Sequence, residues 1–245
     1  MSKFVLLDTR FWAGGADLTG TSNKVEISTE VEAKETTNYL SAGFKEFIGG
    51  LASSEWKAGG FWEAGDPSMV DDESWADQGA VIPVTAVPSG GGAVGDVAYF
   101  TQALRSSYAL LGDVGDVAPW QASLNGSWPT VRGLVGHPAG TARSATGTGT
   151  AQQLGAVATG KSLYATLHVL SAAGSTPSIT GRVESDDNAG FTTPTTRLTF
   201  AAATTAGGQI LRTDGTAITD DYWRIAWTIS GITPSFLFAA ALGIR

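Results

Sequence analysis

The sequence predicts an all-β protein, a β-sandwich with at most one short helix, and three observations support this fold class. Glycine accounts for 32 of the 245 residues, while Lys, Glu and Leu, which sustain long helices, are sparse. Thr, Val, Trp and Phe are frequent instead, and most of these residues favour strands. Several segments also alternate apolar and polar residues between turn-forming clusters, which is typical of a sandwich or a barrel.

The clearest strand prediction covers residues 24–34. Its odd-numbered positions are Val, Ile, Thr, Val and Ala, and its even-numbered positions are Lys, Glu or Ser. A period of two predicts that Val25, Ile27 and Val31 pack inward while the opposite face is wet and acidic. The other predicted strands are residues 96–102, 179–184, 197–200, 222–229 and 236–244.

Turn-forming clusters predict the loops and the domain organisation. Residues 63–78 and 88–92 are expected to be loops, and a short helix is expected at residues 44–48. Residues 138–150 are a Gly/Ala/Thr/Ser-rich linker or loop with little to bury. This segment divides the chain into a β domain at residues 1–137 and a C-terminal β segment at residues 151–245.

Composition excludes several classes of function. The chain has no cysteine, which excludes disulfides, thiolate nucleophiles and Cys-based zinc sites. The net charge is −8, and residues 1–77, with fourteen acidic and six basic residues, carry all of this excess. Such a distribution is the reverse of the basic patch of a nucleic-acid-binding protein. The apolar run at residues 4–7 is too short for a signal peptide, and residues 236–242 are too few to span a bilayer.

One segment matches a nucleotide-binding motif. Residues 155–162, GAVATGKS, fit the phosphate-binding loop pattern G-x-x-x-x-G-K-[ST], in which backbone N–H groups and a lysine, here Lys161, hold phosphates at the start of a helix. A buried strand should precede the loop, but a Gly/Thr-rich run does so. Residues 162–170 are compatible with either a helix or an alternating strand. We therefore favour a glycine turn between strands over a nucleotide site.

The remaining polar residues do not form a predicted catalytic or metal site. His137 and His168 lack partners at ligand spacing and are predicted to lie at the surface or at a rim. Residues 71–73 and 186–188 contain clustered carboxylates that could in principle hold calcium, although Asx-rich turns explain both. The Glu26, Glu30 and Glu32 row is ordinary for a solvated strand face and does not by itself indicate a glycosidase.

The tryptophans fall into two groups by their local sequence. Trp223 and Trp227 alternate with polar residues and are predicted to be core residues. Trp56, Trp62 and Trp75 lie in or near Gly-rich or acidic segments, where aromatics serve as partner contacts or loop anchors.

Two regions of the chain resemble the major tail (tube) proteins of long-tailed bacteriophages with non-contractile tails. In residues 16–62 the resemblance is carried by ADLTG at 16–20, NKVEIS at 23–28, TTNY at 36–39, SAGF at 41–44, IGGL at 48–51 and GGF at 59–61. In residues 152–245, where actinobacterial phages provide the best likeness, it is carried by QLGAV at 153–157, SLYA at 162–165, VESDDNAGF at 183–191, TDDYW at 219–223 and ALGI at 241–244. Residues 65–150 match only weakly.

The resemblance implies a structural protein without enzymatic activity or cofactor. Its long strands would join those of neighbouring subunits in a barrel, and the subunits would form stacked, hexameric rings through which DNA leaves without specific binding. The implied partners are other copies of the chain and the tail-tip, tape-measure and tail-terminator proteins. The implied location is the virion tail, assembled in the host cytoplasm, with no membrane involved.

The residues themselves suggest where such an assembly would make contact. Glu26, Glu30 and Glu32 are predicted to face the lumen, where like charge keeps DNA from binding. Residues 36–50 and 64–79 are predicted to form the contacts between subunits or rings, because apolar side chains gather in these loops. The predicted contact residues are Tyr39, Phe44, Phe47, Ile48, Met69 and Trp75. The alternative is a phage- or cell-wall-associated carbohydrate-binding β-sandwich module, which would share the strands and the loop aromatics.

Overall fold

The computed structural model describes residues 5–65 and 69–245 and confirms the all-β class. Within these ranges the helical elements are α1 (Val70–Ala76) and a 3-10 turn, η1 (Gly90–Gly92). The strands of the first half are β1 (Arg10–Ala13), β2 (Ala16–Asp17), β3 (Ser22–Glu35), β4 (Phe47–Phe61), β5 (Val81–Val87), β6 (Val97–Leu110), β7 (Pro119–Gly126) and β8 (Val131–His137). Those of the second half are β9 (Gly147–Thr148), β10 (Gln152–Gln153), β11 (Leu163–Asp186), β12 (Thr195–Thr199), β13 (Gly207–Arg212) and β14 (Tyr222–Ile244).

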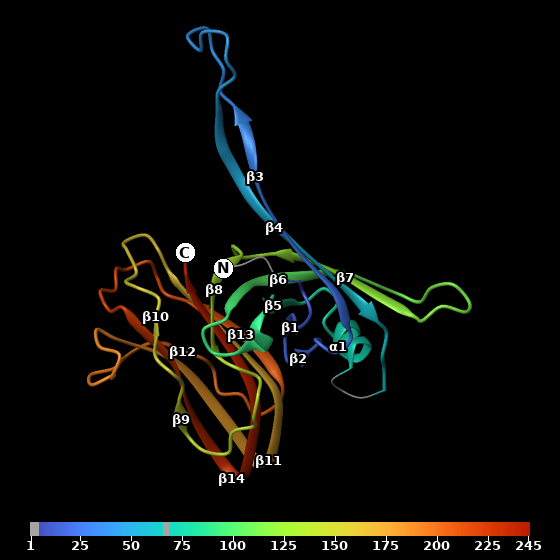
Figure 1. Ribbon diagram of the computed structural model, residues 1–245, viewed down its shortest axis with the longest axis vertical. Helices are drawn as coiled ribbons and strands as arrows, with labels where there is room; N and C mark the ends of the chain where they lie inside the picture. The colour runs from blue at the N-terminus through green and yellow to red at the C-terminus, as the bar shows by residue number, and fades with distance from the viewer. Residues whose placement is uncertain (1–4, 66–68) are drawn as a thin grey trace.

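The strands are connected into one branched antiparallel sheet that folds over itself (Figure 1). Its main path runs in the order β12-β11-β14-β8-β6-β5-β1-β2. A second branch, β3-β4-β7, leaves this path at β6, because the second half of β6 pairs with β7. The β3–β4 hairpin extends from the body of the protein as a long free-standing arm (Figure 1).

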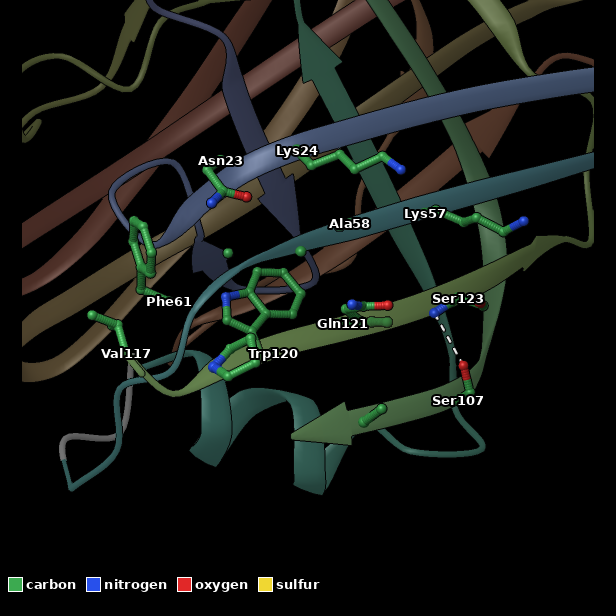
Figure 2. A pocket seen from close by; sticks show the side chains of 15 residues that line it. Asn23, Lys24, Lys57, Ala58, Phe61, Ser107, Val117, Trp120, Gln121 and Ser123 are labelled. Atoms are coloured by element: carbon green, nitrogen blue, oxygen red, sulfur yellow. Dashed lines mark hydrogen bonds between the residues drawn. The ribbon is translucent and has the colours of Figure 1, made fainter. Parts of the chain in front are cut away.

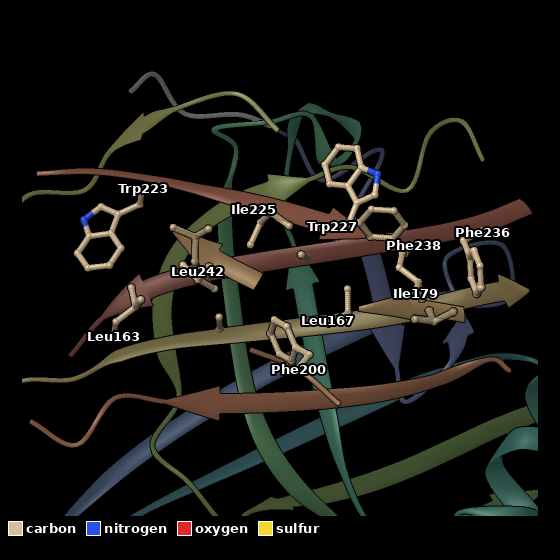
Figure 3. Packing of buried hydrophobic residues seen from close by; sticks show 14 of the residues in the cluster. Leu163, Leu167, Ile179, Phe200, Trp223, Ile225, Trp227, Phe236, Phe238 and Leu242 are labelled. Carbon is tan, nitrogen blue, oxygen red and sulfur yellow. The ribbon is translucent and has the colours of Figure 1, made fainter. Parts of the chain in front are cut away.

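Three buried clusters form the core. One is built on the paired long strands β11 and β14 and contains Trp223, Phe236 and Phe238 (Figure 3). A second lies beneath the β4–β7 branch and contains Trp56 and Trp120. The third contains side chains from both halves of the chain, so β8 and β14, which also pair directly, are held in a common core.

The strand predictions agree with the structure. Each predicted segment lies within or overlaps a strand, and 222–229 and 236–244 both belong to the continuous strand β14. The segment 162–170, for which helix and strand were both possible, enters β11 and is extended. Trp223 and Trp227 are buried in the β11/β14 core, as predicted.

The helix prediction at residues 44–48 is wrong. Phe47 and Ile48 begin β4, where they pair with Glu35 and Lys34 of β3, because the hairpin ladder continues almost to its tip. The α-helix instead occupies part of the expected loop 63–78. Its first turn carries three consecutive acidic residues, which interact favourably with the positive end of the helix dipole. Val70 and Ser74, one turn apart, are buried and attach the helix to the body.

Residues 138–150 run along the surface of β14. Gly147 and Thr148 pair with Trp227 and Ala226, and Arg143 forms an isolated bridge with Phe236. These contacts hold the segment against the C-terminal half of the protein. The division into residues 1–137 and 151–245 stays a prediction, because the strands on the two sides of it share one sheet.

Candidate assembly surfaces

The β3-β4-β7-β6 branch is a four-stranded antiparallel sheet with two free edges. Among the described residues β3 pairs only with β4, and residues 106–110 of β6 pair only with β7. Ser22 pairs with Gly60, Gly60 with Trp120, and Trp120 with Leu110. The base of β3, the end of β4, the start of β7 and the end of β6 therefore lie level at one end of the branch.

One face of this sheet belongs to the core. Trp56 and Trp120 are fully buried on it, and the Trp56 Nε1 donates a hydrogen bond to Thr130 Oγ1 at 3.1 Å. Trp56 is therefore a core residue of β4, so the prediction that it serves as a loop contact is wrong. Trp62 is half-buried against the same cluster. Val25 and Ile27 also pack here as predicted, whereas Val31 is 60% exposed, so its predicted burial is wrong for the isolated chain.

The opposite face is polar and contains a shallow hollow of about 420 Å³ (Figure 2). Lys24 and Lys57 lie on this face, where they pair with Glu26 and Glu55 at 3.1 Å. Lys34 pairs with Glu32 farther along the arm. Glu30 is exposed and has no basic partner within salt-bridge distance in the described part of the chain. The predicted acidic face is thus mostly charge-balanced, and Glu30 carries its unbalanced charge.

The end of the β3–β4 arm exposes several large apolar side chains. Tyr39 and Phe44 in the connecting loop are 107% and 79% exposed, and Phe47 and Ile48 at the start of β4 are also exposed. Leu40 and Leu51 extend this apolar surface and were not singled out from the sequence. Apolar side chains grouped on a projecting arm typically mark a contact with another protein.

The second predicted contact loop is only partly exposed. Trp75 on α1 is 67% exposed, whereas Met69, which precedes the helix, is half-buried. Residues 66–68 of this loop lie outside the described ranges. Trp75 is therefore the exposed aromatic residue in the described part of the 64–79 segment. Its role in contacts between subunits stays a prediction.

The β6–β7 turn is a further apolar projection that the sequence analysis missed. Leu111, Val114 and Val117 are 64%, 106% and 71% exposed and lie at the base end of the sheet. The available signal was the alternation of apolar residues with Gly and Asp in LGDVGDV, residues 111–117. This pattern resembles an ordinary turn unless the isolated Val and Leu residues are considered together.

Both histidines are buried, so their predicted surface position is wrong. His168 donates from Nδ1 to the Gly14 carbonyl and accepts at Nε2 from the Thr85 hydroxyl, both at 2.8 Å. Burial, only partly offset by the bond to Gly14, lowers the pKa of His168 from 6.5 to about 4. These bonds tie β11 to β5 and to the β1–β2 turn. His168 thus has a structural role.

His137 is buried in a different part of the core. Its ring stacks on Phe238 with centroids 4.0 Å apart, and its Nδ1 donates to the Phe238 carbonyl at 3.1 Å. Burial likewise lowers its pKa to about 4. The two imidazoles are therefore neutral at physiological pH.

The segment 155–162 does not form a phosphate-binding loop. Strand β11 follows it where the motif requires a helix. The backbone N–H groups of Gly155, Val157 and Gly160 donate to carbonyls of residues 215–221, and those of Lys161 and Ser162 also have carbonyl acceptors within the chain. Because these N–H groups are already satisfied, they do not converge on an anion. The segment is a turn between strands, as favoured from its sequence.

The clustered carboxylates have local structural partners. Asp186 accepts hydrogen bonds from the backbone N–H groups of Asn188 and Thr193, which confirms the Asx-turn interpretation for this segment. Asp71 and Asp72 instead lie in the first turn of α1, so the turn interpretation is wrong for them. No group of three or more His, Cys, Asp or Glu with metal-binding geometry occurs in residues 5–65 and 69–245. Within the same ranges, no helix has the length and apolar character needed to cross a membrane.

Comparison with known proteins identifies solved structures that are similar at low sequence identity. Neither a family model nor a curated protein matches the chain. The chain is similar to a protein of the native gene transfer agent virion, with 15% identity, a TM-score of 0.40 and coverage of 50% of this chain and 93% of that one. It is similar to a protein of an extracellular contractile injection system sheath–tube complex, with 12% identity, a TM-score of 0.44 and coverage of 54% and 93%. It is also similar to the SPP1 tail tube, with 12% identity, a TM-score of 0.40 and coverage of 51% and 76%.

Proposed function

We propose that this chain is the tube subunit of a phage tail, a structural protein that forms stacked hexameric rings and carries no catalytic site. The observation that carries the proposal is the β3-β4-β7-β6 sheet, which has two free edges, a wet face and a projecting arm. An edge strand left open invites pairing with another chain, and closure into a barrel removes such edges. The sequence resemblance to tube proteins of non-contractile phage tails, best in actinobacterial phages, supports the same assignment.

The strand directions permit this closure between identical copies. Successive strands of the branch are antiparallel, so β3 and the second half of β6 run in opposite directions. The free edge of β3 in one copy can therefore pair antiparallel with residues 106–110 of β6 in the next copy. Rotation about an axis along the strands repeats this contact and closes a ring.

The position of the core determines which face of the sheet would line the lumen. The face that carries Trp56 and Trp120 is covered by the body of the subunit. The bodies must lie outside a closed barrel, so the polar face turns inward. Glu26, Glu30 and Glu32 would then face the lumen. Since Glu26 and Glu32 are paired with lysines, Glu30 would carry the charge that repels passing DNA.

The arm provides a contact between rings. It extends beyond the body along the strand direction, and therefore along the axis of the proposed tube (Figure 1). Tyr39, Phe44, Phe47 and Ile48 would be buried against the adjacent ring, and Trp75 and Met69 would contribute a second contact from the body. The tail-tip, tape-measure and tail-terminator proteins are the proposed partners at the ends and in the lumen of the tube. The proposed location is the virion tail, after assembly in the host cytoplasm.

Electron microscopy of the purified protein at increasing concentration tests this function. Hollow rods of uniform width, with rings visible end-on, are the expected result. A protein that remains monomeric at every concentration would contradict the proposal. If that monomer also bound immobilised glycans, the function would instead be that of a carbohydrate-binding module.

A further inference from the structure

Helix α1 presents one large aromatic side chain to the solvent. Val70 and Ser74 face the body and are buried, whereas Trp75 is 67% exposed. Asp71, one helical turn before Trp75, accepts a hydrogen bond from the Tyr108 hydroxyl at 2.9 Å, so this side of the helix lies beside β6. Figure 2 shows the helix, in teal, next to the end of β6 and away from β3. Trp75 is thus an uncovered aromatic residue at the β6 margin of the sheet.

A hollow of about 550 Å³ lies beneath the opposite margin, under the free edge of β3. Its apolar lining comes from β3, from the end of β5, from the start of β6 and from the N-terminal segment: Val25, Ile27, Ala86, Pro88, Tyr99, Leu6 and Leu7. Leu6 and Leu7 are 63% and 86% exposed, so this surface is accessible in the single chain. The volume lies within the range of about 300–1,000 Å³ of pockets that hold small-molecule ligands, so a tryptophan side chain fits.

The strand register places the helix and the hollow at the same level of the sheet. Two rows of paired residues cross the sheet from β6 to β3, and they are Tyr108–Ala122–Ala58–Val25 and Arg105–Leu124–Trp56–Ile27. Tyr108 holds the start of α1, and Arg105 forms two backbone hydrogen bonds of 3.0 Å with residues 79–80, just after the helix. The helix therefore spans the levels of Val25 and Ile27, the apolar β3 residues of the hollow.

The helix and the hollow also lie on the same face of the sheet. The inner members of both rows are buried in the core, and Tyr108, Val25 and Ile27 pack against the same cluster. When the β6 margin of one copy meets β3 of the next, α1 therefore passes beneath β3. Strand tilt in a barrel staggers neighbouring strands. The hollow and an adjoining one together extend over residues 22–29 of β3, so a stagger of one residue pair keeps the helix within them.

We infer that Trp75 of one copy docks into the hollow beneath β3 of the neighbouring copy in the same ring. This inference rests on the proposed function and names the side-by-side contact that it requires. Trp75 packs on Val25, Ile27 and Leu7 of the neighbour, as a buried aromatic anchor does at the centre of an interface. The contact is heterologous, since each copy contributes its helix on one side and its hollow on the other, and such contacts close into rings.

Charge complementarity favours a second copy of the chain over an unrelated partner as the occupant. The first turn of α1 carries three consecutive carboxylates, and none of them forms a salt bridge in the described ranges. The two hollows are lined by three basic residues and one acidic residue: Lys24, Arg132, Arg245 and Asp8. Opposite charges on the two halves of a contact set its register and suppress other partners.

Site-directed crosslinking tests the inference, because the chain has no native cysteine. Ala76→Cys lies beside Trp75 on the exposed side of α1, and Leu7→Cys lies at the rim of the hollow. The two proteins are made separately, mixed under assembly conditions and treated with a short bismaleimide. A crosslinked dimer should form in the mixture and in neither protein alone. The matched control combines Ala76→Cys with Ile232→Cys, which is 68% exposed on β14, and should give no dimer.

A second experiment distinguishes a contact within the ring from a contact between rings. Phe44→Asp removes the proposed contact between rings and should leave single rings. In this background, Trp75→Ala should weaken the association of subunits into rings about thirtyfold, which corresponds to a loss of roughly 2 kcal/mol. Trp75→Phe keeps an aromatic side chain and should retain most of the association. Circular dichroism of each variant checks that the fold is retained.

The outcomes separate the inference from the proposed function. Rings that form without the crosslink between Ala76→Cys and Leu7→Cys would overturn the inference and leave the tube assignment intact, and so would rings that Trp75→Ala does not weaken. Ala76→Cys protein that crosslinks to itself would also overturn it, since that result requires an isologous contact. Absence of rings or rods from the unmodified protein at every concentration would overturn the proposed function itself.

Discussion

Replacement of Phe44 by Asp should prevent the stacking of rings while leaving the subunit folded. Phe44 is 79% exposed in the single chain, so its side chain contributes little to the free energy of folding. Burial of a phenylalanine against another subunit is worth about 2 kcal/mol, and an unpaired carboxylate in its place adds a desolvation penalty of at least about 1 kcal/mol. With about six copies in a ring, the loss is roughly 18 kcal/mol for each junction between rings.

Sedimentation velocity and electron microscopy measure this effect. The Phe44→Asp variant should remain as subunits or single rings at concentrations at which the unmodified protein forms rods. Phe44→Leu keeps an apolar side chain and should still form rods, which makes it the matched control. Adding Trp75→Asp should reduce association further, to monomers. Rods of normal length from Phe44→Asp, at the usual concentration and with an unchanged melting temperature, would refute the assignment of the arm to ring stacking.

Three further outcomes are expected. Glu30→Lys should leave tube formation unchanged but slow DNA ejection from phage that carry it, as measured by dye release, because the lumen would attract phosphates; normal ejection would contradict the orientation of this face. Lys161→Ala should change neither assembly nor thermal stability in the presence of Mg-ATP, and a nucleotide-dependent shift that this variant abolishes would contradict the turn assignment. The lowered pKa of His168, about 4 against an ordinary 6.5, means that the unfolded chain takes up a proton first as the pH falls. Stability should therefore decrease between pH 6.5 and 4, by about 3 kcal/mol from this group, and denaturant titrations of His168→Gln should show a correspondingly weaker pH dependence.

The long strands show why a local sequence pattern predicts that a strand exists better than it predicts where the strand begins and ends. Gly231 and Pro234 suggest a break between residues 229 and 236, yet β14 continues through them. Its partner β11 has a matching irregularity, since Gly174 and Gly231 both have positive φ and the register shifts between Ser175 and Ser178. The two strands bend together and keep most of their pairing. This compensation depends on a segment more than fifty residues away, so neither sequence segment reveals it alone.

The surface prediction for the histidines is wrong for a related reason. Isolation in sequence favours an exposed position, because no ligand or catalytic partner occurs nearby. The partners of His168 are a backbone carbonyl at Gly14 and a hydroxyl at Thr85, both remote in sequence. Backbone carbonyls carry no sequence signature, and a neutral imidazole needs only one donor and one acceptor to be buried.

The alternating apolar face of β3 extends farther along the strand than the core of the single chain covers. Its alternation continues from Val25 to Ala33, with Thr29 as the polar member of the otherwise apolar face, but the body covers only its first part. Val25 and Ile27 are half-buried, whereas Val31 is 60% exposed and Ala33 is exposed as well. If β3 packed only within its own chain, we would expect the alternation of apolar and polar residues to stop where the body ends. In the proposed tube, another copy would supply the packing for the part of the pattern that has no partner in the chain, and the same argument applies to the apolar tip of the arm.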